Sequence, residues 1–451
     1  HQKARQVIQS KKLKLHRNFP FYISKILTFT FAIIQYKKYM KKLLPLICLI
    51  LLVASCKNDD DVTTPRCTEP TNIEASTISF DGATLTWTDE NDTASFSIEY
   101  GLSGFMPGSG TVISSESTNL AISNLESNTN YDVYITSVCS ASNESMLSDP
   151  LTFTTLPPPV IPQFLTNLSE LNIYSGSLSE LRPSIYTIEY DLASPLFSDY
   201  AHKQRLIALP PGTTMNYVDD GFPDFPDNTL ISKTFFYNNN EQDLTQGKRI
   251  IETRILIKIN GEWELGNYKW NAEMTEATLD TEGGLVPVTY VDENGETNNV
   301  NYQIPTAADC FTCHSISGEE TPIGPRLRTL NFDGQLQDFI DNNYIDGIAD
   351  ATSVGSLPRW DDTSFTLEER ARAYFDINCA HCHTEGGFCD TESDLRLRWE
   401  TDFNASNIYE DRFLILGRMT TYIPGWSMPF IGTTMIHEEG FDLIEEYILS
   451  L

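Results

Sequence analysis

TLEERARAYFDINCAHCH, residues 366–383, decides how the C-terminal part of the chain is interpreted. Thr366 and Glu369 have the spacing of a capping box, which predicts that a helix begins there. Apolar side chains then recur on one face of that helix, at Leu367, Ala371, Tyr374 and Phe375. The predicted helix leads directly into Cys379, the first residue of a C-x-x-C-H pentapeptide.

The same pentapeptide pattern occurs twice, as Cys310-Phe-Thr-Cys313-His314 and as Cys379-Ala-His-Cys382-His383. C-x-x-C-H is the attachment pattern of c-type haem, in which two thiols bond the two vinyl groups and the adjacent His binds the iron. The sequence therefore predicts two haem c groups. Their covalent attachment residues are Cys310, Cys313, Cys379 and Cys382, and their proximal ligands are His314 and His383.

Two other chemistries remain open for these cysteines. The two pairs can share one zinc ion, although the 65 residues between Cys313 and Cys379 far exceed the gap of a zinc ribbon. They can also form disulfides or a redox dithiol, although no thioredoxin-like βαβ pattern surrounds them.

The surroundings of the second motif resemble class I cytochromes c over roughly residues 360–451. Met428-Pro429 follows the motif, and an amphipathic helix is expected at Glu438–Leu451 with Phe441, Ile444, Ile448 and Leu451 on its apolar face. The resemblance implies that Met428 is the distal iron ligand, and a core methionine is the alternative. Within this region, His381 is expected at the surface and Cys389 as a buried thiol.

The first motif has less of this context. A hairpin-like segment, Thr289–Ile304, precedes Cys310, and no capped helix is expected there. No Met or His occurs between His314 and Cys379, so a distal ligand comes from elsewhere in the chain or is absent. The candidates are His202, Met274, Met419, Met435 and His437.

Residues 163–305 are predicted to be mainly β, with strands at Leu230–Tyr237, Ile250–Ile259 and Glu262–Trp270 and a hairpin turn at Asn260-Gly261. The whole of residues 163–451 resembles an uncharacterised family of diheme c-type cytochromes. The segments that carry this resemblance are Ser194–Ala201, Lys233–Phe235, Glu252–Arg254, Tyr268–Asn271 and both C-x-x-C-H motifs. It implies a β-rich domain at 163–305, a first haem segment at 306–355 and a second, class I-like haem domain at 356–451.

Residues 67–156 have the alternating pattern of a β-sandwich. Runs such as Ser95–Tyr100 and Tyr131–Val138 are separated by Gly, Asn and Ser turns. Leu125–Tyr131 resembles the tyrosine corner of fibronectin type III domains, with Trp87 as the core tryptophan. Cys67 and Cys139 lie near the two ends of this unit, so a disulfide is expected in an exported protein. A proline-rich linker follows at 157–162.

The N-terminal part predicts export. From Met40, two lysines and an apolar run precede Val53-Ala-Ser-Cys56, which resembles the lipobox of a lipoprotein signal peptide. This pattern assigns 1–39 as a segment upstream of the translation start and 40–55 as the signal peptide. Cys56 is then the lipid anchor, and 56–66 is a tether. We therefore expect an outer-membrane lipoprotein on either the periplasmic or the cell-surface face.

The charge distribution agrees with an exported redox protein. Residues 1–55 hold eleven Lys and Arg and no acidic residue, which leaves 20 basic against 62 acidic side chains beyond them. Such a surface disfavours nucleic acid and favours a cationic partner. The expected function is membrane-tethered electron transfer to a redox protein or small carrier, with no catalytic residue assigned. The alternatives are a peroxidase-like enzyme with an open first haem, and a surface-binding module formed by the sandwich.

Substituting Cys56 with Ala should abolish incorporation of a labelled fatty acid and release the protein from membranes, because the thiol that carries the lipid is lost. The measurement is membrane partition with and without the substitution. Unchanged partition would place the anchor elsewhere in the chain.

Overall fold

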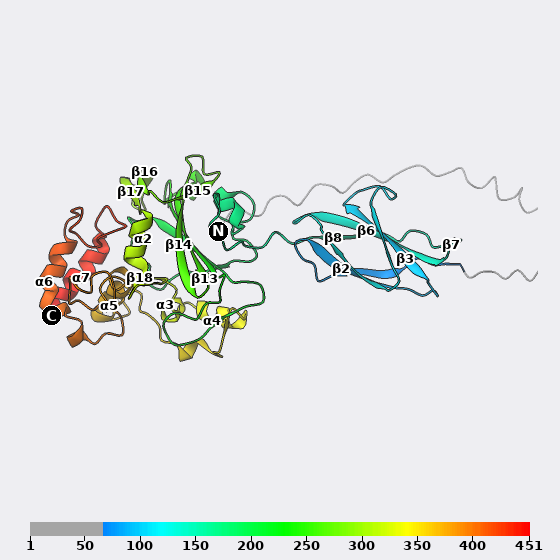
Figure 1. Ribbon diagram of the computed structural model, residues 1–451. Coiled ribbons are helices and arrows are strands. Elements are labelled where there is room, and N and C mark those ends of the chain that lie inside the picture. Colours follow the sequence, from blue (N-terminus) through cyan, green and yellow to red (C-terminus); the bar gives the residue numbers. More distant parts are fainter. Residues whose placement is uncertain (1–65) are drawn as a thin grey trace, which may run out of the picture.

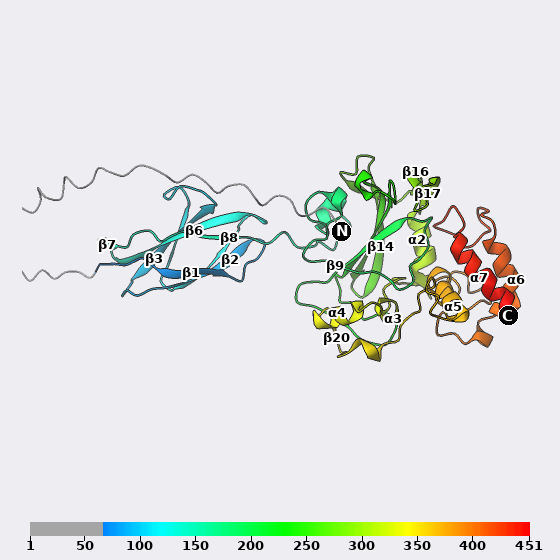
Figure 2. The same ribbon diagram turned by 180° about the vertical axis from the view of Figure 1, so that it is seen from behind.

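The computed structural model describes residues 66–451, which form a β-sandwich, a β-rich region and a helical region in chain order (Figures 1 and 2). The expected signal peptide at 40–55, the lipid anchor Cys56, the segment 1–39 and nearly all of the tether lie outside the described residues. No helix among the described residues is both long and apolar enough to span a membrane.

The sandwich consists of two antiparallel sheets, β1-β2-β5 and β4-β3-β6-β7, with β8 also pairing with β6. Its strands are β1 (Thr71–Ser76), β2 (Gly82–Thr88), β3 (Ser95–Leu102), β4 (Thr111–Ser115), β5 (Asn119–Ser123), β6 (Asn130–Ser140), β7 (Asn143–Glu144) and β8 (Leu151–Thr154). Trp87 is buried edge-on against Phe96, with ring centroids 5.1 Å apart. The Glu126 backbone N–H donates to the hydroxyl of Tyr131 at 2.9 Å, which is the hydrogen bond expected of a tyrosine corner.

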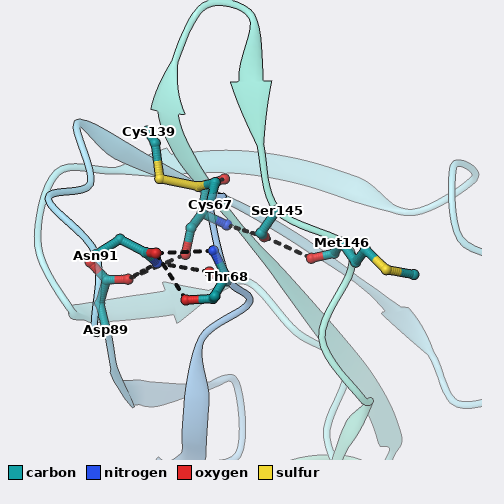
Figure 3. The surroundings of a disulfide bond; sticks show 8 residues. Cys67, Thr68, Asp89, Asn91, Cys139, Ser145 and Met146 are labelled. Carbon is teal, nitrogen blue, oxygen red and sulfur yellow. Dashed lines mark hydrogen bonds between the residues drawn. A yellow bond between two sulfur atoms is a disulfide. The ribbon is translucent and has the colours of Figure 1, made fainter. Parts of the chain in front are cut away.

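A disulfide joins Cys67 to Cys139 at an S–S distance of 2.07 Å (Figure 3). The Asn91 side chain fixes the next residue, since its Oδ1 accepts from the backbone N–H and the hydroxyl of Thr68. Its Nδ2 in turn donates to the Thr68 carbonyl at 2.8 Å. The start of the sandwich is therefore fastened to the end of β6 covalently and to the loop after β2 by hydrogen bonds.

The β-rich region is built on a six-stranded antiparallel sheet in the order β15-β14-β13-β12-β10-β9. The three strands expected from the sequence match its centre closely. The strands of this sheet are β9 (Ile188–Glu189), β10 (His202–Ala208), β12 (Leu230–Asn238), β13 (Lys248–Ile259), β14 (Glu262–Trp270) and β15 (Ala277–Asp280). Three two-stranded sheets accompany it: β16 (Gly284–Val291) with β17 (Thr297–Ile304), β18 (Ser315–Ile316) with β19 (Glu319–Glu320), and β11 (Met215–Asn216) with β20 (Ile345–Asp346). The β16–β17 hairpin packs on β12 and β13 through a cluster that includes Phe235, Tyr237, Tyr290 and Tyr302.

The segment 306–355 shares the core of the β-rich region. Helices α3 (Leu327–Leu330) and α4 (Gln335–Asp341) place Leu327, Leu330, Leu336 and Phe339 in the same buried cluster as Ile207 and Ile231 of the sheet. Residues that follow the first motif are thus held by the β-sheet, and they do not form a core of their own.

The helical region comprises α5 (Leu367–Asn378), α6 (Ile408–Met419) and α7 (Glu438–Ser450). The expected capping box is confirmed, since Thr366 Oγ1 accepts from the Glu369 N–H and the Thr366 N–H donates to the Glu369 carboxylate. Ile444 and Ile448 of α7 are buried as expected. The expectation for Leu451 was wrong: it follows the last helical residue and is 41% exposed, and Leu443 and Tyr447 fill the apolar face instead.

Residues 194–200 fasten the helical region to the sheet, and we call this segment the clasp. Ser194 Oγ donates to the Pro358 carbonyl and accepts from the Trp360 N–H. The Phe197 N–H donates to Asn378 Oδ1 at 2.8 Å, one residue before Cys379. The buried carboxylate of Asp199 accepts from the N–H and hydroxyl of Thr434. The clasp therefore fixes the second motif with respect to the β-rich region.

A buried ion network makes a second connection. Asp376 of α5, 1% exposed, lies 3.4 Å from an Arg326 nitrogen and 3.3 Å from an Arg328 nitrogen. It also accepts the Trp399 N–H at 3.0 Å. Arg328 also pairs with the half-exposed carboxylate of Glu400. Because both guanidinium groups are buried, Asp376 supplies the buried counter-charge that they share.

Asp376→Ala should destabilise the protein by about 3–5 kcal/mol, because it removes the carboxylate paired with buried Arg326 and leaves Arg328 with the half-exposed Glu400 alone. The free energy of unfolding in urea measures the effect. Asp361→Ala is the matched control: it breaks an exposed ion pair with Arg359 and should cost less than about 1 kcal/mol. Equal losses in the two variants would contradict the role assigned to Asp376.

Candidate functional site

The first C-x-x-C-H motif lies at the end of α2 (Ala307–His314). Thr306 and Asp309 form a capping box at its start, so the expectation that no capped helix begins before Cys310 was wrong. Asp takes the position where Glu or Gln usually signals this box, and that substitution hid the helix in the sequence. The second motif follows α5, with Cys379 as the residue that ends the helix.

A cavity of about 300 Å³ adjoins the second motif and brings the expected ligands together. Cys379, His383 and Met428 all line it. The rest of its wall is mainly apolar and includes Phe375, Phe388, Leu395, Leu397, Leu414, Ile415, Met419 and Phe430. A mainly apolar cavity with an imidazole and a thioether in its wall suits a large planar ligand that binds through a metal.

His383 is held as a neutral imidazole. Burial lowers the pKa of His383 to about 4, with nearby cations adding to the effect. Its Nδ1 is buried and has no hydrogen-bond partner among the described residues. A buried polar nitrogen without a partner is costly in a folded chain, which marks this imidazole as a candidate metal ligand.

The first motif adjoins a smaller cavity of about 50 Å³, which lies against the sheet. Cys310, Cys313 and His314 line it from α2, and Lys233 and Arg254 line it from β12 and β13. His314 Nδ1 is 2.7 Å from the Thr321 carbonyl oxygen. Because a carbonyl can only accept, Nδ1 carries the proton and Nε2 keeps its lone pair for a metal.

Basic side chains line this first cavity, although the chain as a whole is strongly acidic. Arg254 pairs with the buried Glu252 at 2.6 Å, and the Tyr302 hydroxyl also donates to that carboxylate at 2.6 Å. Burial, with Arg254 and Arg205 nearby, lowers the pKa of Lys233 to about 7. Burial also lowers the pKa of His314 to about 3. Two basic side chains, Lys233 and Arg254, therefore line the cavity, and of these only Arg254 forms an ion pair among the described residues.

The two motifs meet, although 65 residues separate them in the sequence. The side chains of Cys313, His381 and Cys382 each offer one ligand atom, and these three atoms lie within 4.8 Å of one another. Hydrogen bonds from Cys382 and His381 lower the pKa of the Cys313 thiol, and the same contact raises that of Cys382. Two thiols and an imidazole at this separation are also a donor set for a transition metal.

His381 was expected at the surface, and its side chain is in fact only partly exposed. It lines the first cavity together with His314, and its Nδ1 is buried without a partner among the described residues. No sequence signal distinguishes this position from any other between the two cysteines of a motif. Its placement results from the clasp, which turns this part of the second motif toward the first.

The distal-ligand candidates named from the sequence lie outside the first cavity. His202 pairs with Glu241 at 2.7 Å, Met274 contacts the Ile250 backbone, and Met435 packs against the β16–β17 hairpin. His437 is stacked between Phe197 and Tyr374. Met419 lines the cavity of the second motif instead. Cys389 also lines that cavity and is only partly buried.

Comparison with known proteins identifies the sandwich. Residues 68–154 match the fibronectin type III domain family. Among solved structures, the fn3 domain of human collagen alpha-1(XX) is 19% identical, with 22% of this chain and 93% of that chain covered and a TM-score of 0.20. The fn3 domain of human contactin 1 is 15% identical, with 23% and 95% covered and a TM-score of 0.19.

No curated protein matches the chain. The family match ends before the linker and so has no bearing on either C-x-x-C-H motif. The chain is therefore a multidomain protein with a fibronectin type III domain at residues 68–154, followed by a β-rich region and later helices.

Proposed function

We propose that this protein is a diheme c-type cytochrome that transfers electrons, exported and anchored to the outer membrane through Cys56. The observation that carries the proposal is the cavity of the second motif, where Cys379, His383 and Met428 share one apolar wall. Thiol, imidazole and thioether are the three groups that attach a haem and ligate its iron in class I cytochromes c.

A bound haem would supply a reversible one-electron carrier, and the chain would tune it. At the second motif, His383 and Met428 would hold the iron, and the thioether favours the ferrous state. The buried side chains of Leu395, Leu397 and Ile415 form the inner apolar wall of the cavity and would limit the access of water to the iron. Phe388 and Leu414 line the same cavity and are 52% and 55% exposed, so they mark the side on which a partner protein or small carrier would approach.

At the first motif, different residues would act. Lys233 and Arg254 line that cavity and offer positive charge to the carboxylates of a haem. Among the described residues no methionine lines it, so the ligand set at this iron would differ from that at the second. Two different sites predict two different midpoint potentials, because axial ligands and local charge tune the iron.

The contact between the motifs supports electron exchange within the chain. A third cavity, of about 50 Å³, is lined by residues of both, including Cys313, Cys379, Cys382 and Met428. Groups attached at Cys313 and Cys382 would therefore lie side by side. The strongly acidic surface beyond residue 55 favours a cationic redox partner.

A second candidate function is a transition-metal site formed by Cys313, His381 and Cys382, favoured by their convergence within 4.8 Å. Haem attachment modifies the same thiols, so one molecule cannot have both functions.

Two further alternatives are a peroxidase-like enzyme with an open first haem and a binding module at residues 67–156. A high-spin first haem would favour the peroxidase-like enzyme. Ligand binding by the isolated sandwich would favour the binding module.

The purified protein should contain about two haem groups per chain, one for each motif, that survive extraction with acid acetone because they are covalently bound. A pyridine haemochrome assay counts them. The double substitution Cys379→Ala and Cys382→Ala should remove one group, whereas Cys389→Ala should remove none. Complete loss of colour on extraction would exclude haem c, and stoichiometric zinc in the colourless protein would support the metal site.

Met428→Ala should abolish the near-infrared charge-transfer band between a thioether and ferric haem, because Met428 is the methionine opposite His383 in the proposal. Met419→Ala is the matched control, since Met419 lines the same cavity. The band should persist in that variant. A band that survives Met428→Ala and disappears with Met419→Ala would reassign the ligand.

A further inference from the structure

The first cavity contains an imidazole that the attachment pattern does not use. Once Cys310 and Cys313 are bonded to a haem and His314 is its proximal ligand, two side chains that line the cavity still offer a nitrogen lone pair: His381 and Lys233. Either side chain could supply the second ligand of an iron bound at His314.

His381 is the better donor. Its Nδ1 is buried without a hydrogen-bond partner among the described residues, so a metal would satisfy a nitrogen that the protein leaves unpaired. Imidazole is also a common axial ligand of haem iron, whereas lysine is not among the usual ones. Lys233 Nζ lies 5.4 Å from the centre of the Phe235 ring, and its charge has a separate use beside the carboxylates of a haem.

The position of His381 is also fixed. It lies between Cys379 and Cys382, two residues that the second haem would hold covalently, and the Cys382 and His383 N–H groups both donate to the Cys379 carbonyl. The clasp sets this turn against the sheet through the bond between Phe197 and Asn378. His381 therefore enters the first cavity from a turn with little freedom to move.

We propose that His381 is the distal axial ligand of the haem at the first motif, opposite His314. This inference rests on the proposed function and makes it more specific. One short peptide then holds the second haem through its cysteines and the first iron through its histidine. Electrons would pass between the two sites along a covalent path within that peptide.

The test is the spin state of the purified, fully matured protein. Electron paramagnetic resonance of the oxidised wild type should show low-spin haem only, and histidine labelled with ¹⁵N should contribute two ligating nitrogens at one iron. His381→Ala should convert one of the two haems to high spin, and added imidazole should restore the low-spin signal. His202→Gln is the matched control, because His202 lies with Glu241 away from the cavity, and its spectrum should equal that of the wild type.

The haem count separates the outcomes. A wild type without covalent haem would overturn the proposed function and this inference together. A His381→Ala protein with two haems per chain and an unchanged low-spin spectrum would overturn the inference alone. Loss of the low-spin signal in Lys233→Met but not in His381→Ala would assign the ligand to Lys233. The ¹⁵N measurement uses the wild-type chain, so it decides the matter even if the His381→Ala protein fails to fold.

Discussion

The hydrogen bond from the Phe197 N–H to Asn378 Oδ1 sets the geometry on which both candidate sites depend. Asn378 is the last residue of α5 and precedes Cys379, so this bond fixes where the second motif begins with respect to the sheet. Ser194 and Asp199 add bonds on either side, to Pro358, Trp360 and Thr434. The clasp therefore holds the turn that contains His381 beside the first motif.

Charge is arranged in opposite ways on the surface and inside the protein. The chain carries a formal charge of −31, yet several basic side chains are buried or partly buried within it. Arg326 and Arg328 share Asp376, and Arg254 is balanced by Glu252. Lys233 has no such carboxylate within hydrogen-bond distance among the described residues. An anionic group in the first cavity would complete this balance, as the carboxylates of a haem would.

Local signals in the sequence predicted local structure well. The capping box at Thr366, the tyrosine corner at Tyr131 and the central strands of the sheet appear where their patterns place them. The sequence did not reveal α2, because Asp309 replaces the usual Glu or Gln of the capping box, nor the convergence of Cys313, His381 and Cys382. Convergence of this kind is set by contacts between distant segments, such as Phe197 with Asn378, and no periodicity or spacing in the sequence encodes these contacts.

The proline-rich linker has a mechanical consequence. Leu156 is still bonded to the sandwich through Ser79, whereas the Pro157 carbonyl already accepts from the Tyr186 hydroxyl and the Pro159 carbonyl from Asn172. Residues attached to the sandwich are thus followed directly by residues attached to the β-rich region. The linker therefore contains almost no segment without hydrogen bonds to one side or the other. In a chain tethered at Cys56, the sandwich would act as a spacer between the tether and the region that contains the two C-x-x-C-H motifs.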